Sequence, residues 1–338
     1  MRQGHQSWVF PLKPVILGHA AIGGPFEAKG PLAEDFDILH GDLMLGQDSW
    51  EKAEKVLLEE ACSKAVEKAG LTKEQINFML AGDLMNQIIS ASFSARTLSI
   101  PFLGIFGACS TAMEGLALAG LMVNSQAAEY VLAATSSHNG AAEKQYRYPT
   151  EYGSQKPPTA QWTVTGAGAA VVASQGKGLR ITGATIGHVV DMGLTDPFNM
   201  GAAMAPAALS TIESHFRDFQ LPHDHYDLIV TGDLGRTGHA ILSDLLPKHH
   251  MQIPLERYVD CGKLIYGENP NVWSGGSGCG CIATVTYGHL LRRMQQGEWK
   301  RILLVATGAL LSPLSFQQGE SIPCIAHAVA VESEQLGE

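Results

Sequence analysis

Three short apolar segments in the first half of the chain recur in the same order in the second half. Each is a continuous hydrophobic run that ends in small residues, which is typical of a strand buried on both faces of a parallel sheet. The pairs are 76–84 with 226–234, 130–136 with 302–308, and 165–172 with 324–331. We therefore predict two α/β halves of one topology, residues 1–175 and 176–338, in which duplicated βαβαβ units pack as five layers, α/β/α/β/α.

Helix signals lie between the predicted strands. Ser49 begins a helix that runs to Lys68 and ends before a glycine, because Ser is a favoured N-cap and Gly a favoured terminator. Helices are also predicted over 112–123 and 201–219. The polar and aromatic segment 137–161 is predicted to be a long loop, and such a loop usually covers a pocket or forms a subunit contact.

Composition excludes several classes of protein. With 45% hydrophobic and 17% charged residues, the chain is globular rather than disordered. Its formal net charge of −10 argues against nucleic acid as a partner. No apolar run reaches the roughly 18 residues that a transmembrane helix needs, and the first residues lack the apolar core of a signal peptide. We expect a protein without its own transmembrane segment, which reaches a membrane only through a partner.

The cysteine and glycine patterns bear on cofactors. The six cysteines are scattered and form no CxxC motif, which favours reduced thiols and argues against structural zinc. The glycine-rich segment 274–281 lacks the lysine of a P-loop and the spacing of a dinucleotide fingerprint. We predict no metal and no cofactor, and we interpret this segment as a loop that lets two helices and a ligand approach closely.

One cysteine stands out by its position. Cys109 lies in the segment 107–111, which follows the apolar run 100–106 and opens the predicted helix 112–123. The unpaired N–H groups and the positive end of the dipole at such a helix start favour a thiolate or a bound anion. Cys109 is therefore a candidate nucleophile, a residue of an anion site, or a buried inert thiol.

The duplicated halves and the cysteine at a helix start resemble the thiolase superfamily, which includes the thiolases and the ketoacyl-carrier-protein synthases. Several segments are more similar to the stage V sporulation protein AD family of endospore-forming bacteria. They are 107–114, 133–139, 146–153, 195–201, 274–281 and 305–313. This resemblance implies a thiolase-like fold and a homodimer. It also implies binding of dipicolinic acid (pyridine-2,6-dicarboxylate), alone or with calcium, and help in its uptake into the developing spore. The implied location is peripheral at the spore inner membrane, beside membrane partners, in an otherwise cytoplasmic protein.

The catalytic set of that superfamily is incomplete in this chain. Condensing enzymes combine a thiolate, oxyanion donors, and His with a second His or Asn for proton handling. At the matching positions this chain has Gly232 with Asp233 and the segment 275–277, and it has no second cysteine near 307–309. Losing one member of such a unit commonly costs about four orders of magnitude in rate. We therefore expect no enzyme activity, and the N–H groups of Cys109 and Gly308 are predicted to bind a carboxylate instead.

Several candidate ligand contacts have a structural alternative. His138 and His327 are consistent with ligand contacts or with buried structural histidines. Arg147, Lys156 and Arg236 could each meet a carboxylate or form a surface ion pair. The predicted ligand-binding residues are Cys109, His138, Arg147, Gly276, Ser277, Gly308 and His327.

Asp83 and Asp233 occupy equivalent repeat positions after predicted strands, where capping of the following helix is favoured over metal or ligand binding.

Two other functions stay open from the sequence. An acyl-transferring condensing enzyme that uses Cys109 would need a replacement base, for which His138 and His239 are the nearest candidates. A purely structural subunit of a spore membrane assembly would have no affinity for a small molecule.

Overall fold

The computed structural model describes residues 1–146 and 156–333. Its main feature is a mixed β-sheet that contains two five-stranded units, one from each half of the chain. The first unit consists of β3 (Val15–Gly23), β5 (Phe78–Gly82), β6 (Phe102–Gly104), β7 (Tyr130–Ser137) and β9 (Gly166–Ala173). The second consists of β10 (Leu179–Ile186), β11 (Leu228–Thr231), β12 (Tyr258–Asp260), β14 (Arg301–Ala309) and β15 (Cys324–Glu332).

The two units repeat each other strand for strand. The order is β6-β5-β7-β9-β3 in the first unit and β12-β11-β14-β15-β10 in the second. In both, the three strands at one end pair in parallel, and the last two strands pair antiparallel. The six segments predicted as repeated strands are β5, β7, β9, β11, β14 and β15, so the prediction of an α/β fold with duplicated topology is confirmed.

The units also join edge to edge, which the repeats do not predict. Antiparallel pairing connects Leu179 to Ile16 and Arg180 to Val15, so β3 and β10 make one sheet continuous through the molecule. The strand β2 (Ser7–Val9), which pairs with β1 (Arg2–Gln3), extends β10 at the same join. A two-residue pairing leaves no periodic pattern in the sequence, which is why it could not be foreseen.

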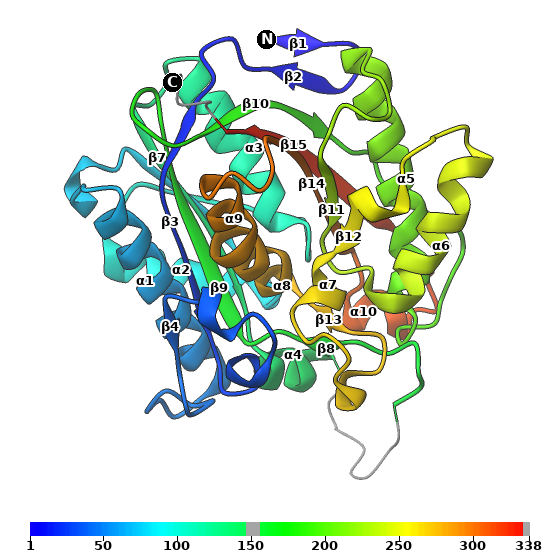
Figure 1. The fold of residues 1–338 in the computed structure, drawn as a ribbon. Coiled ribbons are helices and arrows are strands. Elements are labelled where there is room, and N and C mark those ends of the chain that lie inside the picture. Colours follow the sequence, from blue (N-terminus) through cyan, green and yellow to red (C-terminus); the bar gives the residue numbers. More distant parts are fainter. Residues whose placement is uncertain (147–155, 334–338) are drawn as a thin grey trace.

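Helices form the other layers of the molecule (Figure 1). α1 (Trp50–Lys68) and α2 (Ile89–Leu98) cover the outer face of the first unit, and α5 (Met200–Phe219) and α6 (Gly235–Lys248) cover that of the second. Between the units lie α3 (Thr111–Asn124), α8 (Cys279–Thr284), a π-helical turn (Val285–Leu290) and α9 (Leu291–Gln295). The inner helices are buried on opposite sides because they pack between the two five-stranded units, so the five predicted layers are present.

The predicted helix boundaries agree closely with the structure. The hydroxyl of Ser49 accepts a hydrogen bond from the N–H of Lys52 at 3.3 Å and caps α1, which ends at Lys68 as predicted. α3 and α5 each begin one residue before the predicted start. These helices follow local capping and periodicity, the signals that a sequence carries most directly.

The predicted loop 137–161 is wrong over its first ten residues. Ser137 is the last residue of β7, and the helix α4 (Asn139–Tyr146) follows. Ala141 and Ala142 bury this helix against Leu84, Met85 and Cys279, and this tertiary packing outweighs its weak helical pattern. Arg147 lies outside the described residues.

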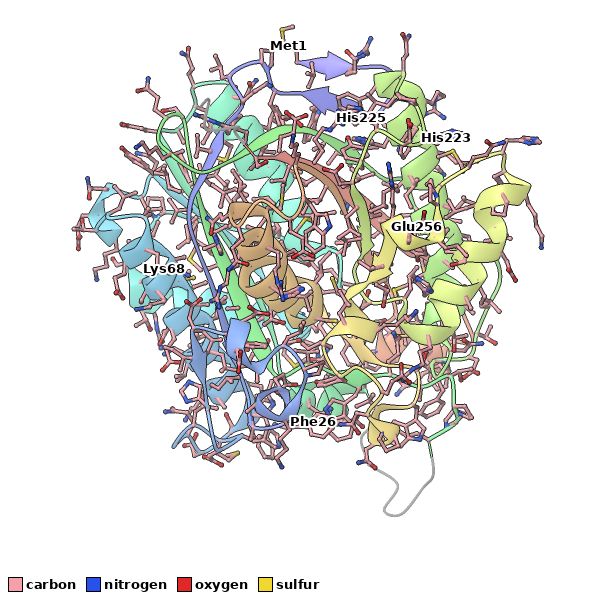
Figure 2. The ribbon with its side chains drawn as sticks, viewed as in Figure 1. Met1, Phe26, Lys68, His223, His225 and Glu256 are labelled. Atoms are coloured by element: carbon pink, nitrogen blue, oxygen red, sulfur yellow. The ribbon has the colours of Figure 1, made fainter. Side chains whose placement is uncertain are left out.

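The carboxyl ends of β7 and β14 point to the end of the molecule where α4, α10 (Pro313–Gln317) and the short parallel pair β8 (Trp162–Thr163) and β13 (Gly276–Ser277) lie (Figure 1). Phe26, labelled at this end in Figure 2, packs against Trp162 and Tyr266 with ring centroids 4.9 and 5.1 Å apart. The remaining short elements are β4 (Ile38–Leu39) and α7 (Cys261–Leu264). Among the described residues, no helix has both the length and the apolar character needed to cross a bilayer.

Candidate functional site

The turn that carries Cys109 is held in an unusual backbone conformation. Ala108 has a φ of 50°, in the left-handed region that a residue with a Cβ seldom adopts. Its carbonyl accepts hydrogen bonds from the hydroxyl of Thr111 (2.7 Å) and the thiol of Cys279 (3.2 Å). The N–H of Cys109, directly before α3, has no hydrogen-bond partner in the part of the chain that the structure describes. This amide is therefore available to an acceptor from outside the chain.

The register of β14 corrects the second predicted amide donor. The N–H of Leu310 donates to the carbonyl of Pro323 at 2.8 Å, and Gly308 pairs with Ile325 two residues earlier in the same ladder. Hydrogen-bonded pairs recur every two residues in an antiparallel ladder, so the N–H of Gly308 faces β15. The N–H of Ala309 faces the opposite way, past the end of β11, which makes Ala309 the amide that can serve with Cys109.

Gly308 is instead required for close contact. A Cβ on this residue would lie 2.3 Å from the carbonyl oxygen of Gly107 and 3.0 Å from the N–H nitrogen of Ser110. Real Cβ atoms essentially never approach a backbone oxygen so closely. Gly308 therefore lets β14 press directly against the turn that presents Cys109.

Asp233 follows β11 and lies beside the thiol of Cys109. Its side chain is almost fully buried and accepts hydrogen bonds from the hydroxyl of Thr307 (2.7 Å) and the N–H of Gly278 (3.1 Å). Burial raises the pKa of Asp233 to about 6, against the lowering effect of these donors. The carboxyl that faces Cys109 is thus held by donors from β14 and from the glycine-rich loop.

The thiol of Cys109 is not activated. Burial, followed by the negative charge of Asp233, raises the pKa of Cys109 well above its ordinary value. The expectation that the helix start favours a thiolate is therefore wrong. The nearby carboxyl and the loss of hydration outweigh the helix dipole, whose effect amounts to only about 1 kcal/mol at most helix ends.

Helix capping is confirmed for Asp83 and wrong for Asp233. Asp83 accepts hydrogen bonds from the N–H groups of Met85 and Ala91, both at 2.7 Å, and so caps α2. In the second half, the N–H groups of Leu234 and of the next residue, at the start of α6, instead donate to Asp260. The helix that follows the strand is thus capped by Asp83 in the first repeat and by Asp260 in the second. Asp233 is not used as a cap and faces Cys109 instead.

The predicted histidines have other partners. In His138, Nδ1 accepts from the N–H of Gly140 (3.0 Å), and Nε2 is 2.9 Å from the carbonyl of Leu43. Both ring nitrogens are thus engaged, and burial lowers the pKa of His138, which favours the structural interpretation. Nδ1 of His327 accepts from the N–H of Gly187 at 3.3 Å, and burial lowers its pKa to about 4. A ligand role for His327 stays a prediction.

The basic candidates are also engaged elsewhere. The guanidinium of Arg236 donates to the carbonyl of Trp273 at 2.7 Å and lies 3.3 Å from a carboxylate oxygen of Glu268. Lys156 pairs with Glu143 at 2.8 Å and lies over the rings of Trp162 and Trp273. These contacts favour structural roles for both side chains.

The alternative base His239 has no hydrogen bond to the thiol of Cys109. Its ring stacks on Tyr258 with centroids 4.4 Å apart, and Nδ1 lies 3.4 Å from the Nζ of Lys263. Of the two candidate bases, neither His138 nor His239 is hydrogen-bonded to the thiol in the described structure.

The glycine-rich loop forms one wall of the site. Gly276 and Ser277 pair with Trp162 and Thr163, and the following N–H of Gly278 donates to Asp233. Ligand contacts from Gly276 and Ser277 stay predictions. The sequence did not single out Cys279 and Thr307, whose hydrogen bonds hold the Cys109 turn and orient Asp233. Only their proximity in space marks them, because neither belongs to a local motif.

A cavity of about 300 Å³ lies elsewhere, on the outer face of the first unit. Its walls include Cys62, Val66, Leu98, Ile100 and Leu132, and it shares no lining residue with the Cys109 site. The described residues contain no group of three or more His, Cys, Asp or Glu side chains placed to hold a metal ion.

Comparison with known proteins finds relatives over nearly the whole chain. The family model of stage V sporulation protein AD matches residues 4–332. Stage V sporulation protein AD of Bacillus subtilis (strain 168) is 49% identical over 329 residues, which cover 97% of each chain.

Solved structures of condensing enzymes share the fold. One is 3-oxoacyl-[acyl-carrier-protein] synthase III from Aquifex aeolicus VF5, which has a TM-score of 0.59 at 14% identity. The match covers 94% of this chain and 99% of the synthase chain. Cerulenin-bound OleA from Xanthomonas campestris has a TM-score of 0.63 at 15% identity over 96% of this chain and 100% of the other. At these identities the likeness concerns the fold alone, which is thiolase-like.

Proposed function

The chain belongs to the stage V sporulation protein AD family, and from this premise we propose that it binds pyridine-2,6-dicarboxylate without catalysing a reaction. The observation that carries the proposal is the pairing of an unactivated Cys109 thiol with Asp233, beside an amide of Cys109 that has no partner within the described chain. A site with amide donors and no proton shuttle suits a carboxylate better than a tetrahedral intermediate. We also propose that the protein acts with membrane partners at the spore inner membrane in the uptake of this compound.

In this proposal one carboxylate of the ligand accepts from the N–H groups of Cys109 and Ala309. Both amides lie at the ends of elements that are fixed by the core, α3 and β14, so they need little reorganisation on binding. The acyl pocket of a condensing enzyme thus becomes a carboxylate receptor.

Calorimetric titration with three ligands tests the proposal. We expect one site per chain for pyridine-2,6-dicarboxylate, weaker heat with benzoate, which has a single carboxylate, and no acylation of Cys109 by acetyl-CoA in intact-mass spectra. Acylated Cys109 with turnover would support a condensing enzyme instead. No heat with any ligand, on protein shown to be folded, would support a purely structural subunit.

We further propose a homodimer that forms through β6. This strand ends the sheet order, so its outward N–H and C=O groups are unpaired by any described strand. Leu103 on β6 is 48% exposed, and Phe93, Phe106 and Ile89 nearby expose 40–49% of their surfaces. A second copy related by a two-fold axis can pair β6 with β6 and cover these side chains.

Leu103→Lys is therefore expected to give a monomer in light scattering, because a charge on an edge strand opposes pairing. Leu255→Lys is the matched control, since Leu255 is 62% exposed and lies beside β12, at the other end of the sheet order. It should keep the state of the native protein. Equal masses for the native protein and Leu103→Lys would contradict this interface.

A further inference from the structure

The neighbours of Asp233 impose a condition on any anion that enters the site. Its carboxyl accepts hydrogen bonds from Thr307 and Gly278 and lies beside the thiol of Cys109, and no basic side chain of the described residues contacts it. The N–H of the same residue, Cys109, is the one offered to the ligand. Thr307, which orients the carboxyl of Asp233, precedes Ala309 by two residues. A ligand carboxylate at these amides would therefore lie close to Asp233, separated from it by the side chain of Cys109.

Two carboxylates this close, in a place with little water, cannot both stay ionised without a large cost. The groups around Asp233 supply no compensating positive charge. They are the thiols of Cys109, Cys261, Cys279, Cys281 and Cys324 and the carboxyl of Asp260. Bringing an anion in thus favours the protonated form of Asp233, and the hydroxyl of that form can also donate to the ligand.

We propose that Asp233 takes up one proton from solvent when a carboxylate binds at Cys109, so that the site accepts its ligand together with a proton. The inference rests on the proposed function and adds the residue that makes binding depend on pH. In the step, a solvent proton joins one oxygen of Asp233, and no bond of the ligand forms or breaks. Asp233 thereby becomes a specificity-determining residue for anions in a position where the fold's relatives have a base.

The protonation of Asp233 in the free protein sets the direction of the pH dependence. The pKa of Asp233 in the free protein is raised to about 6. At pH 7 only about a tenth of the molecules hold this proton, so the apparent affinity is about tenfold below its limit at low pH. Above about pH 6 the affinity should fall roughly tenfold for each further pH unit, while below it the affinity levels off.

The test is calorimetric titration of the native protein with pyridine-2,6-dicarboxylate at about pH 7, in buffers of different ionisation enthalpy. We expect the observed heat to vary with the buffer in the proportion that corresponds to uptake of about one proton. Asp233→Asn should bind about tenfold more tightly at pH 7 and should lose the pH dependence. The native measurement keeps the test valid if the variant does not fold.

One variant serves as a control. Asp83→Asn changes the repeat equivalent of Asp233, whose pKa is also raised to about 6 by burial but which caps α2. It should keep the native pH dependence. Heat that does not vary with the buffer, or an unchanged pH slope in Asp233→Asn, would overturn the inference alone. Absence of heat at every pH would overturn the proposed function as well.

Discussion

Replacing Cys109 by tryptophan is expected to reduce the affinity for pyridine-2,6-dicarboxylate by about a hundredfold or more. The turn that carries Cys109 cannot shift to make room for the indole. Gly308 packs against Gly107 on one side, and hydrogen bonds from Thr111 and Cys279 hold the carbonyl of Ala108. The indole must therefore extend into the space before the Cys109 amide, which the ligand needs. Cys109 is only half-buried, so the fold should persist.

The matched variant Cys109→Ala should weaken binding only about threefold, because the backbone amides remain. Titration calorimetry of both variants, with circular dichroism as the check on folding, measures the contrast. Unchanged affinity in Cys109→Trp would place the ligand elsewhere in the molecule. A complete loss in Cys109→Ala would mean that the thiol itself, rather than the amide, holds the ligand.

Replacing Gly308 by alanine is expected to cost on the order of 2–3 kcal/mol of stability and to weaken ligand binding as well. The added Cβ would meet the backbone oxygen of Gly107 at 2.3 Å, and neither β14 nor the Cys109 turn has a flexible side chain there to give way. Thermal unfolding should show a Tm lower by on the order of 5 °C.

Gly41→Ala is the control for Gly308→Ala. Nothing lies within 4 Å of a Cβ on Gly41, and its backbone is not in the left-handed region. Its Tm should stay within about 1 °C of the native value. A Gly308→Ala protein as stable as Gly41→Ala would show that β14 and the turn are not in firm contact.

The fold could be predicted largely from local and repeated signals. The six repeated strands end in small residues, and Ser49 caps α1, so each pattern leads to an element without help from distant residues. The helix α4 was missed because Ala141 and Ala142 become a buried face only against Leu84 and Cys279, which lie far away in sequence. A helix whose buried face depends on distant residues cannot be recognised from its own sequence.

The site was harder to predict for a related reason. The pairing of Asp233 with Cys109 joins residues that are distant in sequence, and the repeat itself argued for a cap by analogy with Asp83. The shift from Gly308 to Ala309 depends on the hydrogen-bonding phase of β14, which changes with every residue of register. The sequence singled out the Cys109 turn but could not decide which amide of β14 faces away from β15.

The account rests on a ligand carboxylate that accepts from the N–H of Cys109, and nuclear magnetic resonance can observe that amide directly. Protein labelled with ¹⁵N-cysteine has only six backbone signals, and the one missing in Cys109→Ser assigns Cys109. On titration with pyridine-2,6-dicarboxylate we predict a downfield proton shift of this signal, with no change for Cys62, which lies on α1 away from the site. A Cys109 signal that stays in place while the ligand binds would contradict the account.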